Sequence, residues 1–308
     1  DKSLDTLNEY ALKDERIKVY SQTNSGPSAT RNNALKYVTG EFVMFLDSDD
    51  WFNLEACMIL YDTITNYNAD VVMFPYVREY GNVSLQKHIF NEKVIIFNEF
   101  DCKNLHRRHV GIINNELADP QNSDALCSAS TKIYKTKILK ENKLSFEDTK
   151  IIGSYEDGLF NLNYYGYIKK AVYINEYLFH YRKNNDNSLT TVYNSNLVDQ
   201  WDNLYRIINN YIQSNKLGGD YFIGLQNRIA ISLITLGINL ASSNLSFRIK
   251  VKTIKGIIKK PNYQLALKQL KLGHFQFHWL VFFWLCKRNM SISVIILSYL
   301  MNRLRRII

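Results

Sequence analysis

The chain has 308 residues, of which 46% are hydrophobic and 22% are charged, a composition that excludes disordered and collagen-like chains and allows a large core. The net charge of +9 hides an asymmetry, because residues 221–308 contain 14 Lys or Arg and no Asp or Glu, whereas residues 1–220 contain 24 basic and 29 acidic side chains. This basic third predicts an anionic surface as a partner. The four cysteines lack pairing or metal-ligand spacing, which predicts reduced thiols in a cytosolic compartment.

Helices and short apolar strands alternate along the first two thirds of the chain. We expect helices at residues 4–12, 27–38, 54–67 and 137–142, and strands at residues 17–20, 42–46, 70–77, 132–134, 171–174 and 178–181, while residues 93–97 form an alternating segment. This alternation implies parallel strand pairing and an α/β layered fold. After residue 195 the pattern becomes helical, at 201–212 and 221–240. We therefore expect a first domain at residues 1–195 and a helical, basic region at residues 196–308.

The stretch E-F-V-M-F-L-D-S-D-D, residues 41–50, ends an apolar strand in clustered carboxylates. Carboxylates near an apolar core repel one another and lose solvation, so a cation or hydrogen-bond donors usually compensate them. Asp47 and Asp49 offer the hard oxygen ligands that suit Mg²⁺ or Mn²⁺. A helix-loop-helix calcium loop is excluded, because Phe52 stands where that loop needs Gly. The structural alternative is an Asx turn that caps a helix at Asn53.

The residues of the loop before this strand favour phosphate binding. Gly26 and Pro27 lead into a helix whose N-terminus carries the hydroxyl of Ser28, and helix N-termini favour anions. Arg31 follows one turn later and can fork onto phosphate oxygens. Its alternative role is an ion pair with a surface carboxylate.

A second acidic pair, Glu156 and Asp157, stands at the head of a predicted helix in the segment G-S-Y-E-D-G-L-F-N. A carboxylate at this place can act as a general base. Ser154 followed three residues later by Asp157 is also typical of a helix cap, and the two roles are compatible.

The last segment, residues 275–308, is the most apolar of the chain. Lys287, Arg288 and Asn289 interrupt it, so each apolar piece is shorter than the roughly 20 residues of a spanning helix. We expect helices that lie in the membrane interface, with three aromatic side chains at headgroup depth: Trp279, Trp284 and Tyr299. The alternative is a helical subdomain whose apolar faces pack on each other. Nucleic acid is not expected, because the aromatic residues cluster in apolar runs and not between basic ones.

Three motifs follow one another in order: residues 24–51, N-S-G-P-S-A-T-R-N-N-A-L-K-Y-V-T-G-E-F-V-M-F-L-D-S-D-D-W; residues 153–161, G-S-Y-E-D-G-L-F-N; and residues 179–190, F-H-Y-R-K-N-N-D-N-S-L-T. Together they resemble the family 2 glycosyltransferases of the GT-A fold, over about residues 1–192. The resemblance implies a Rossmann-like α/β fold with a mostly parallel sheet and flanking helices, followed here by a helical C-terminal region. It also implies inverting transfer from a nucleotide-sugar donor.

The resemblance assigns roles residue by residue. Asp49 would bind the divalent cation, Mn²⁺ or Mg²⁺, and Asp47 would lie beside the ribose and the metal. Asp157 would be the general base, with Glu156 beside it. The residues implied at the donor diphosphate are Arg31, Ser28, Asp47, Arg182 and Ser188.

The sequence therefore predicts a metal-dependent glycosyltransferase, peripheral at the cytoplasmic face of the cell membrane. It would move a sugar from a nucleotide-sugar donor to a hydroxyl of a lipid-linked or polymeric glycan. The alternatives are a nucleotidyltransferase, which also holds metal through strand-end aspartates, and a catalytically inactive fragment that binds glycan or membrane. Family members begin with a strand and a D-D-G-S-T-D-type loop, whose last residue Asp1 matches. We therefore expect the first strand and the nucleobase-binding segment to be missing from this chain.

Overall fold

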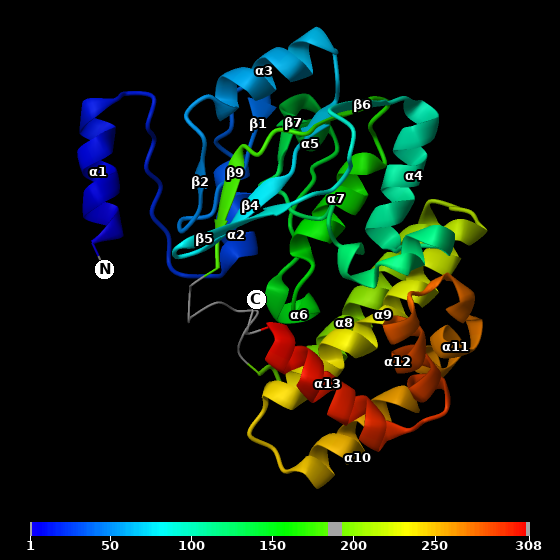
Figure 1. Cartoon of the computed structure of the whole chain (residues 1–308). Coiled ribbons are helices and arrows are strands. Elements are labelled where there is room, and N and C mark those ends of the chain that lie inside the picture. The colour runs from blue at the N-terminus through cyan, green and yellow to red at the C-terminus, as the bar shows by residue number, and fades with distance from the viewer. Residues whose placement is uncertain (1, 184–192, 306–308) are drawn as a thin grey trace.

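The structure is a computed structural model that describes residues 2–183 and 193–305. It has an α/β half, residues 2–183, and a helical half, residues 193–305. Figure 1 shows the helical half extending from one end of the α/β half.

The α/β half contains two sheets and the helices that flank them. Its elements are α1 (Ser3–Lys13), α2 (Pro27–Leu35), β1 (Phe42–Val43), β2 (Trp51–Phe52), α3 (Ala56–Asn66), β3 (Val71–Met73), β4 (Tyr76–Tyr80), β5 (Val83–Lys87), β6 (Val94–Phe97), α4 (Glu99–Val110), the 3₁₀ turns η1 (Asn114–Ala118) and η2 (Pro120–Asn122), β7 (Lys132–Lys135), α5 (Thr136–Glu141), α6 (Thr149–Ile152), α7 (Glu156–Tyr165), β8 (Ala171–Ile174) and β9 (Phe179–Arg182).

The helical half follows without strands in the part that the structure describes. Its elements are α8 (Leu197–Ser214), α9 (Gly219–Ser242), α10 (Phe247–Ile258), α11 (Pro261–Gln269), the 3₁₀ turn η3 (Leu272–His274), α12 (Phe277–Lys287) and α13 (Ser291–Arg305).

The two sheets are mixed. Their strand orders are β1-β7-β3-β8-β6 and β2-β9-β4-β5, and only β3–β8 and β4–β9 pair in parallel among the described strands. The α/β layering of a GT-A fold is confirmed, but the expectation of mostly parallel pairing is wrong. The reason is the long connection through α4, η1 and η2. After it the chain re-enters the sheet at the end where β3 finishes, because the Phe74 amide donates to the Thr131 carbonyl at 3.2 Å. Strand β7 therefore runs antiparallel to β3.

Side chains alternate between the two faces of the five-stranded sheet, as a pleated strand requires. Val71 and Met73 of β3 face the core formed with α4 and α7, whereas Val72 between them faces the core formed with α3. Both faces are therefore covered, which explains why the central strands are short continuous apolar runs.

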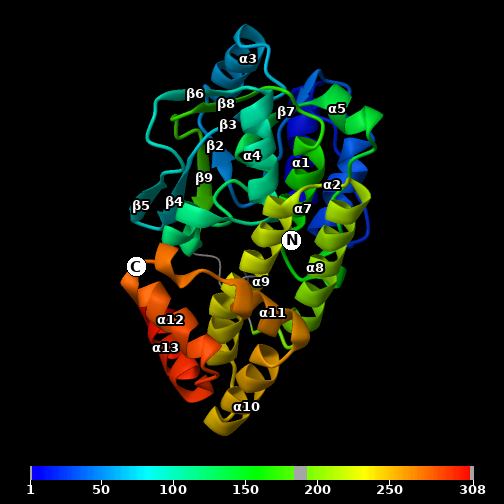
Figure 2. The same cartoon turned by 90° about the vertical axis from the view of Figure 1, so that its right-hand side faces the viewer.

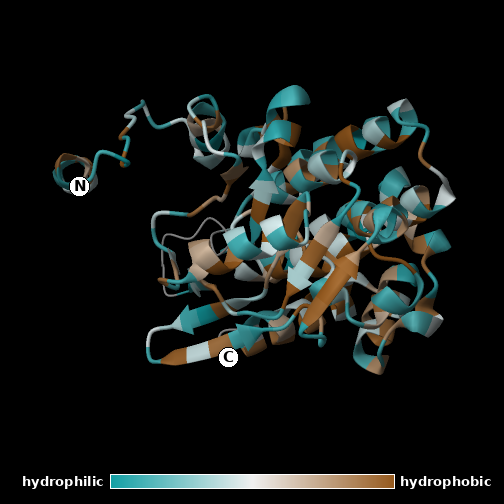
Figure 3. Cartoon of the chain, turned by 90° about the horizontal axis from the view of Figure 1, so that it is seen from above, coloured by the Kyte–Doolittle hydropathy of each residue, from teal (hydrophilic) through white to brown (hydrophobic). Residues whose placement is uncertain are grey.

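Three predicted strands differ from the structure. Residues 17–20 form no strand, residues 42–46 shorten to β1, and residues 70–77 divide into β3 and β4. Apolar residues alone do not make a strand, because the backbone also needs a partner for its hydrogen bonds. Helix α1 and the segment after it stand apart from the body (Figures 1 and 3), and α1 has no buried residue.

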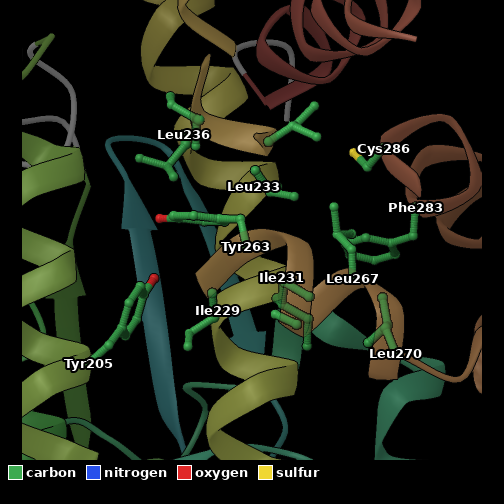
Figure 4. Packing of buried hydrophobic residues seen from close by; sticks show 14 of the residues in the cluster. Tyr205, Ile229, Ile231, Leu233, Leu236, Tyr263, Leu267, Leu270, Phe283 and Cys286 are labelled. Carbon is green, nitrogen blue, oxygen red and sulfur yellow. The ribbon is translucent and has the colours of Figure 1, made fainter. Parts of the chain in front are cut away.

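The helical half has its own apolar core around α9. Tyr205, Leu233, Tyr263 and Phe283 come from four different helices and pack together (Figure 4). Helix α13 also lies against α9, where a Cβ on Gly237 would meet the Ser298 hydroxyl at 2.2 Å. This is the packed subdomain that the sequence left open as an alternative to interfacial helices.

The expected headgroup position of one tail residue is wrong. Trp279 is only 5% exposed and belongs to the apolar core, whereas Trp284 and Tyr299 are 43% and 38% exposed. Trp279 differs because its side of α12 faces the other helices. Among the described residues α9 alone is long and apolar enough to cross a membrane, and 56% of its apolar window is buried inside the protein.

A close backbone contact fixes the two halves together. A Cβ on Gly111, just after α4, would lie 2.0 Å from the carbonyl oxygen of Gly224 in α9. Beside this contact, Asn227 donates to the Ile112 carbonyl at 2.8 Å and Arg228 donates to the Val110 carbonyl at 2.5 Å. Only glycine permits so close an approach, so α9 is held firmly against the end of α4 (Figure 2).

Candidate active site

The first acidic cluster forms a turn at residues 47–50, shortly after β1. The amide of Asp50 donates to the Asp47 carbonyl at 3.1 Å, and the Asp50 carboxylate accepts from the backbone amide of Arg182 at 2.9 Å. The Asx-cap alternative is wrong, because Asn53 bonds instead to the Tyr177 carbonyl and α3 has no side-chain cap. The three carboxylates are therefore gathered beside the end of β9.

Arg31 joins the first acidic cluster to the second one. From α2, its guanidinium contacts Asp47 at 2.6 Å, Asp157 at 2.8 Å and Glu156 at 3.7 Å. Its side chain is only 12% exposed, and it stacks on the ring of Phe146 at 5.3 Å. The structure thus brings together four predicted site residues that lie as far as 126 positions apart.

Asp157 is held by the fold in a way that a simple helix cap does not explain. Its second carboxylate oxygen accepts from the backbone amide of Ala129 at 2.9 Å. Helix α7 begins after Tyr155 with no side-chain cap, and the Ser154 hydroxyl accepts instead from the Trp201 indole at 3.2 Å. The capping alternative for Ser154 is therefore wrong, and Asp157 faces Arg31.

The electrostatics of the acidic pair favour a proton acceptor. Burial raises the pKa of Asp157 above its ordinary value, although Arg31 and the Ala129 amide act in the opposite direction. Burial also raises the pKa of Glu156, and the neighbouring Asp157 charge adds to this shift. A carboxylate with a raised pKa is a stronger base than one in water.

Asp50 is the most clearly perturbed member of the first cluster. Burial raises its pKa from 3.8 to about 6, repulsion from Asp49 and Asp47 adds to the shift, and the Arg182 amide opposes it. The negative charge on this turn is therefore only partly compensated by the chain itself.

The remaining predicted residues occupy different surroundings. The guanidinium of Arg182 lies over the Trp51 ring at 5.7 Å, close to the acidic turn. Ser28 is 3% exposed, and within the described part of the chain its hydroxyl has no hydrogen-bond partner. Ser188 lies outside the described residues. Their roles at a diphosphate stay predictions.

The acidic turn fits a divalent cation without forming a complete cage. The described residues contain no group of three or more His, Cys, Asp or Glu arranged to hold a metal. Mg²⁺, however, is usually bound by one or two carboxylates together with substrate phosphates and water. Asp47 and Asp49, next to the partly compensated charge of Asp50, match that donor set.

Sequence reasoning missed three contributors to the site. Asp50 was seen at the strand end but given no role, and nothing marked the Ala129 amide or the Phe146 ring. A backbone donor has no side-chain signature, and Phe146 is an ordinary core aromatic in sequence. The aromatic residue after the acids, Trp51, is evident in the sequence. Only the fold shows that it stacks on His180, with the ring centroids 5.1 Å apart.

Residues 1–140 match the family model described as "Glycosyl transferase family 2". This part of the chain belongs to that family. The chain is 32% identical over 188 residues to "Glycosyltransferase GlyA" of Streptococcus pneumoniae, covering 59% of this chain and 25% of that protein. It is 28% identical over 183 residues to "Poly(ribitol-phosphate) beta-glucosyltransferase" of Bacillus spizizenii, with the same two coverages. The chain spans about a quarter of the length of these relatives.

A solved structure supports the GT-A fold of this chain. The crystal structure of TarS 1-349 from Staphylococcus aureus, in complex with UDP-GlcNAc, superposes with a TM-score of 0.65 at 20% identity. The alignment covers 98% of this chain and 79% of that one, so it includes the helical half. The predicted GT-A fold is thus confirmed. The family match of residues 1–140 agrees with the predicted family and leaves the nucleotidyltransferase alternative without support.

Replacing Asp50 with Asn should stabilise the protein increasingly as the pH rises from about 4 to about 6. The wild-type carboxylate has a pKa of 3.8 when unfolded and about 6 when folded, so wild-type stability falls through this window. Asn does not ionise and can still accept from the Arg182 amide. After allowance for solvent screening, we expect the free energy of unfolding of Asp50→Asn to exceed that of the wild type by about 1–2 kcal/mol above this window. Urea unfolding in EDTA measures this difference.

The matched control is Asp62→Asn, which changes an exposed carboxylate on α3. If the difference in unfolding free energy between Asp50→Asn and wild type did not change with pH, the raised pKa of Asp50 would be contradicted.

Proposed function

We propose that the full-length protein transfers a sugar from a nucleotide-sugar donor to a hydroxyl of a polymeric or lipid-linked glycan, with inversion at the anomeric carbon. The observation that carries this proposal is the bridge of Arg31 between Asp47 and Asp157. Inverting transfer needs a base on one side of the sugar and positive charge at the departing diphosphate on the other. Asp157 and Arg31 are the candidates for these two tasks, and their membership of one cluster supports the proposal.

In the proposed reaction the acceptor oxygen attacks the anomeric carbon while the bond from that carbon to the diphosphate oxygen breaks. Asp157 takes the proton of the acceptor hydroxyl. In this proposal Arg31 and Arg182 stabilise the charge on the departing nucleoside diphosphate. A diphosphate that recruits Arg31 weakens its hold on Asp157, which makes this carboxylate more basic when the donor is bound.

A divalent cation at Asp47 and Asp49 would supply further positive charge to the donor diphosphate. The support is the donor set of two hard carboxylates beside the partly compensated Asp50. Family 2 glycosyltransferases commonly use such cations, which agrees with this donor set.

The acceptor class is supported by the relatives. Bacillus spizizenii "Poly(ribitol-phosphate) beta-glucosyltransferase" acts, by its name, on a polymer of alditol phosphate. The shared family segment leads us to propose a polymeric cell-envelope glycan or a teichoic-acid type chain as acceptor.

The proposed location is the inner face of the cell membrane, through the helical half. On α13, Ile292, Ile296, Leu300 and Leu304 recur every fourth residue and are 48–60% exposed, which forms one apolar stripe. Basic side chains exposed on the same half include Arg248, Lys252, Lys255, Lys259, Lys268, Lys271, Lys287, Arg288 and Arg303. An apolar stripe near basic groups is typical of an interfacial helix, and each Lys or Arg near an anionic leaflet contributes about 1 kcal/mol.

Replacing Asp157 with Asn in the full-length protein should lower sugar transfer by about 10²–10⁴-fold, because the general base is lost. Donor binding should be retained, since Arg31 keeps its contact with Asp47 and loses only its charged partner Asp157. Nucleoside diphosphate release measures the reaction, and calorimetric titration with UDP-GlcNAc measures donor binding. The control is Asp148→Asn, because Asp148 caps α6 and Asn also caps helices. Unchanged turnover in Asp157→Asn would refute the assignment.

Mn²⁺ added together with UDP should raise the melting temperature of the full-length protein, and Asp49→Asn should remove most of this rise. Ligand at a hundred times its dissociation constant stabilises the folded state by about 2.7 kcal/mol. Thermal unfolding in EDTA provides the baseline, and Asp62→Asn on α3 provides the control. An equal rise in Asp49→Asn would contradict the proposed metal ligand.

Replacing Ile292, Ile296 and Leu300 together with Gln should abolish sedimentation with vesicles that contain phosphatidylglycerol. These side chains are exposed, so their replacement leaves the apolar core intact. The control replaces Leu4, Leu7 and Leu12 of α1, which are also exposed, and should sediment as wild type does. Sedimentation that is unaffected by the α13 change, or absent in the wild type at low salt, would end the membrane proposal.

A further inference from the structure

A cavity of about 230 Å³ lies where the α/β half meets α8 and α9. The two helices run side by side beneath the start of α7 (Figures 1 and 2). The cavity is separate from the Arg31 cluster, and none of the residues assigned to the donor lines it. It is smaller than the roughly 300–1,000 Å³ of pockets for drug-sized ligands, which favours one small unit.

The charges in the cavity are balanced. Arg228 of α9 pairs with Asp124 at 3.0 Å, donates to the Tyr155 hydroxyl at 2.6 Å and stacks on the Tyr155 ring at 3.9 Å. The Arg228 side chain is 10% exposed, whereas that of Asp124 is 54% exposed. An entering anion would meet the Asp124 carboxylate, while a neutral hydroxyl could donate to it. The arrangement therefore favours a neutral polyhydroxyl ligand over a phosphate.

The rest of the lining combines aromatic rings with neutral polar groups. Tyr155, Trp201 and Tyr205 contribute aromatic surface, and the lining also includes Ser123 and Thr235. A few placed polar groups among apolar walls are the usual composition of a small-molecule site. A sugar ring or an alditol has both the C–H surface and the hydroxyls that match it.

The cavity wall continues directly into the proposed catalytic base. Tyr155 is two residues before Asp157, so their Cα atoms are at most about 7.6 Å apart. Tyr155 has a positive φ of 81°, a conformation rare for a side chain of its size and often found at functional sites. A Cβ on Gly158 would lie 2.1 Å from the Tyr155 ring, so glycine at that position lets this ring lie under α7. Cavity and base are thus one rigid unit.

On the basis of the proposed function, we propose that this cavity is an acceptor subsite that binds one neutral sugar or alditol unit of the glycan. The unit in the cavity is a neighbour of the one whose hydroxyl Asp157 deprotonates. Binding there holds the acceptor chain in register with the base, which converts an encounter between two molecules into an oriented reaction.

The test is binding of small probes to the full-length protein by ligand-observed NMR. The probes are N-acetylglucosamine, glucose, ribitol and inorganic phosphate. We expect at least one neutral probe to bind the wild type more strongly than phosphate does. Thr235 is exposed on α9 at the cavity, so Thr235→Trp should block the cavity and weaken this binding at least tenfold without disturbing the core.

Two variants control for the added ring and for the lost hydroxyl. Gln213→Trp adds the same ring at an exposed position of α8 outside the cavity and should bind as wild type does, and Thr235→Ala should keep the cavity open and retain binding. Preference for phosphate, no binding of any neutral probe, or binding unaffected by Thr235→Trp would overturn the subsite. These measurements need no turnover, whereas the Asp157→Asn experiment measures turnover, so failure of the subsite and failure of the proposed function are distinguishable.

Discussion

The site depends on one largely buried cation between two sets of carboxylates. A guanidinium stays charged at any pH that a protein tolerates, so Arg31 is a permanent positive centre. Asp47 and Asp157 reach it at 2.6 and 2.8 Å from distant parts of the chain. Without Arg31 the carboxylates would lose solvation and repel one another with little compensation. The acidic turn after β1 and the start of α7 can therefore share one region only because α2 presents this side chain.

The scaffold is arranged around that requirement. Helix α2 enters at a positive-φ glycine, Gly26, and carries Arg31 to the acids, while the Ala129 amide, supplied by the segment before β7, holds the far oxygen of Asp157. Helix α9 supports the same end of α7 from the other side, because Arg228 stacks beneath Tyr155. The helical half is thus part of the site's support, and the Gly111–Gly224 approach keeps it in place.

The family match and the geometry support different parts of the proposal. The matched segment ends at residue 140, before Glu156 and Asp157 and before the whole helical half. The proposed donor-binding residues Arg31, Asp47 and Asp49 lie within the matched segment. The base assignment instead depends on the order of the motifs and on the contact that Arg31 makes with Asp157.

The sequence alone determined the features that depend on local pattern. Strand-end acids, a glycine-proline loop and an acidic pair indicated the family and the four residues of the Arg31 cluster, and the alternation of helices and strands indicated the α/β layering. The short strands β8 and β9 and the long helices α8 and α9 were also expected close to their places, because their apolar periodicity is strong.

Only the tertiary structure decided what depends on partners. The antiparallel return of β7 and the loss of a strand at residues 17–20 follow from which backbones meet in the sheet. The burial of Trp279 follows from packing among α9, α11, α12 and α13, and no local pattern distinguishes a face that meets protein from one that meets lipid. The Ala129 amide and the cavity at Arg228 were equally hidden, because a backbone donor and an enclosed space exist only after distant segments come together.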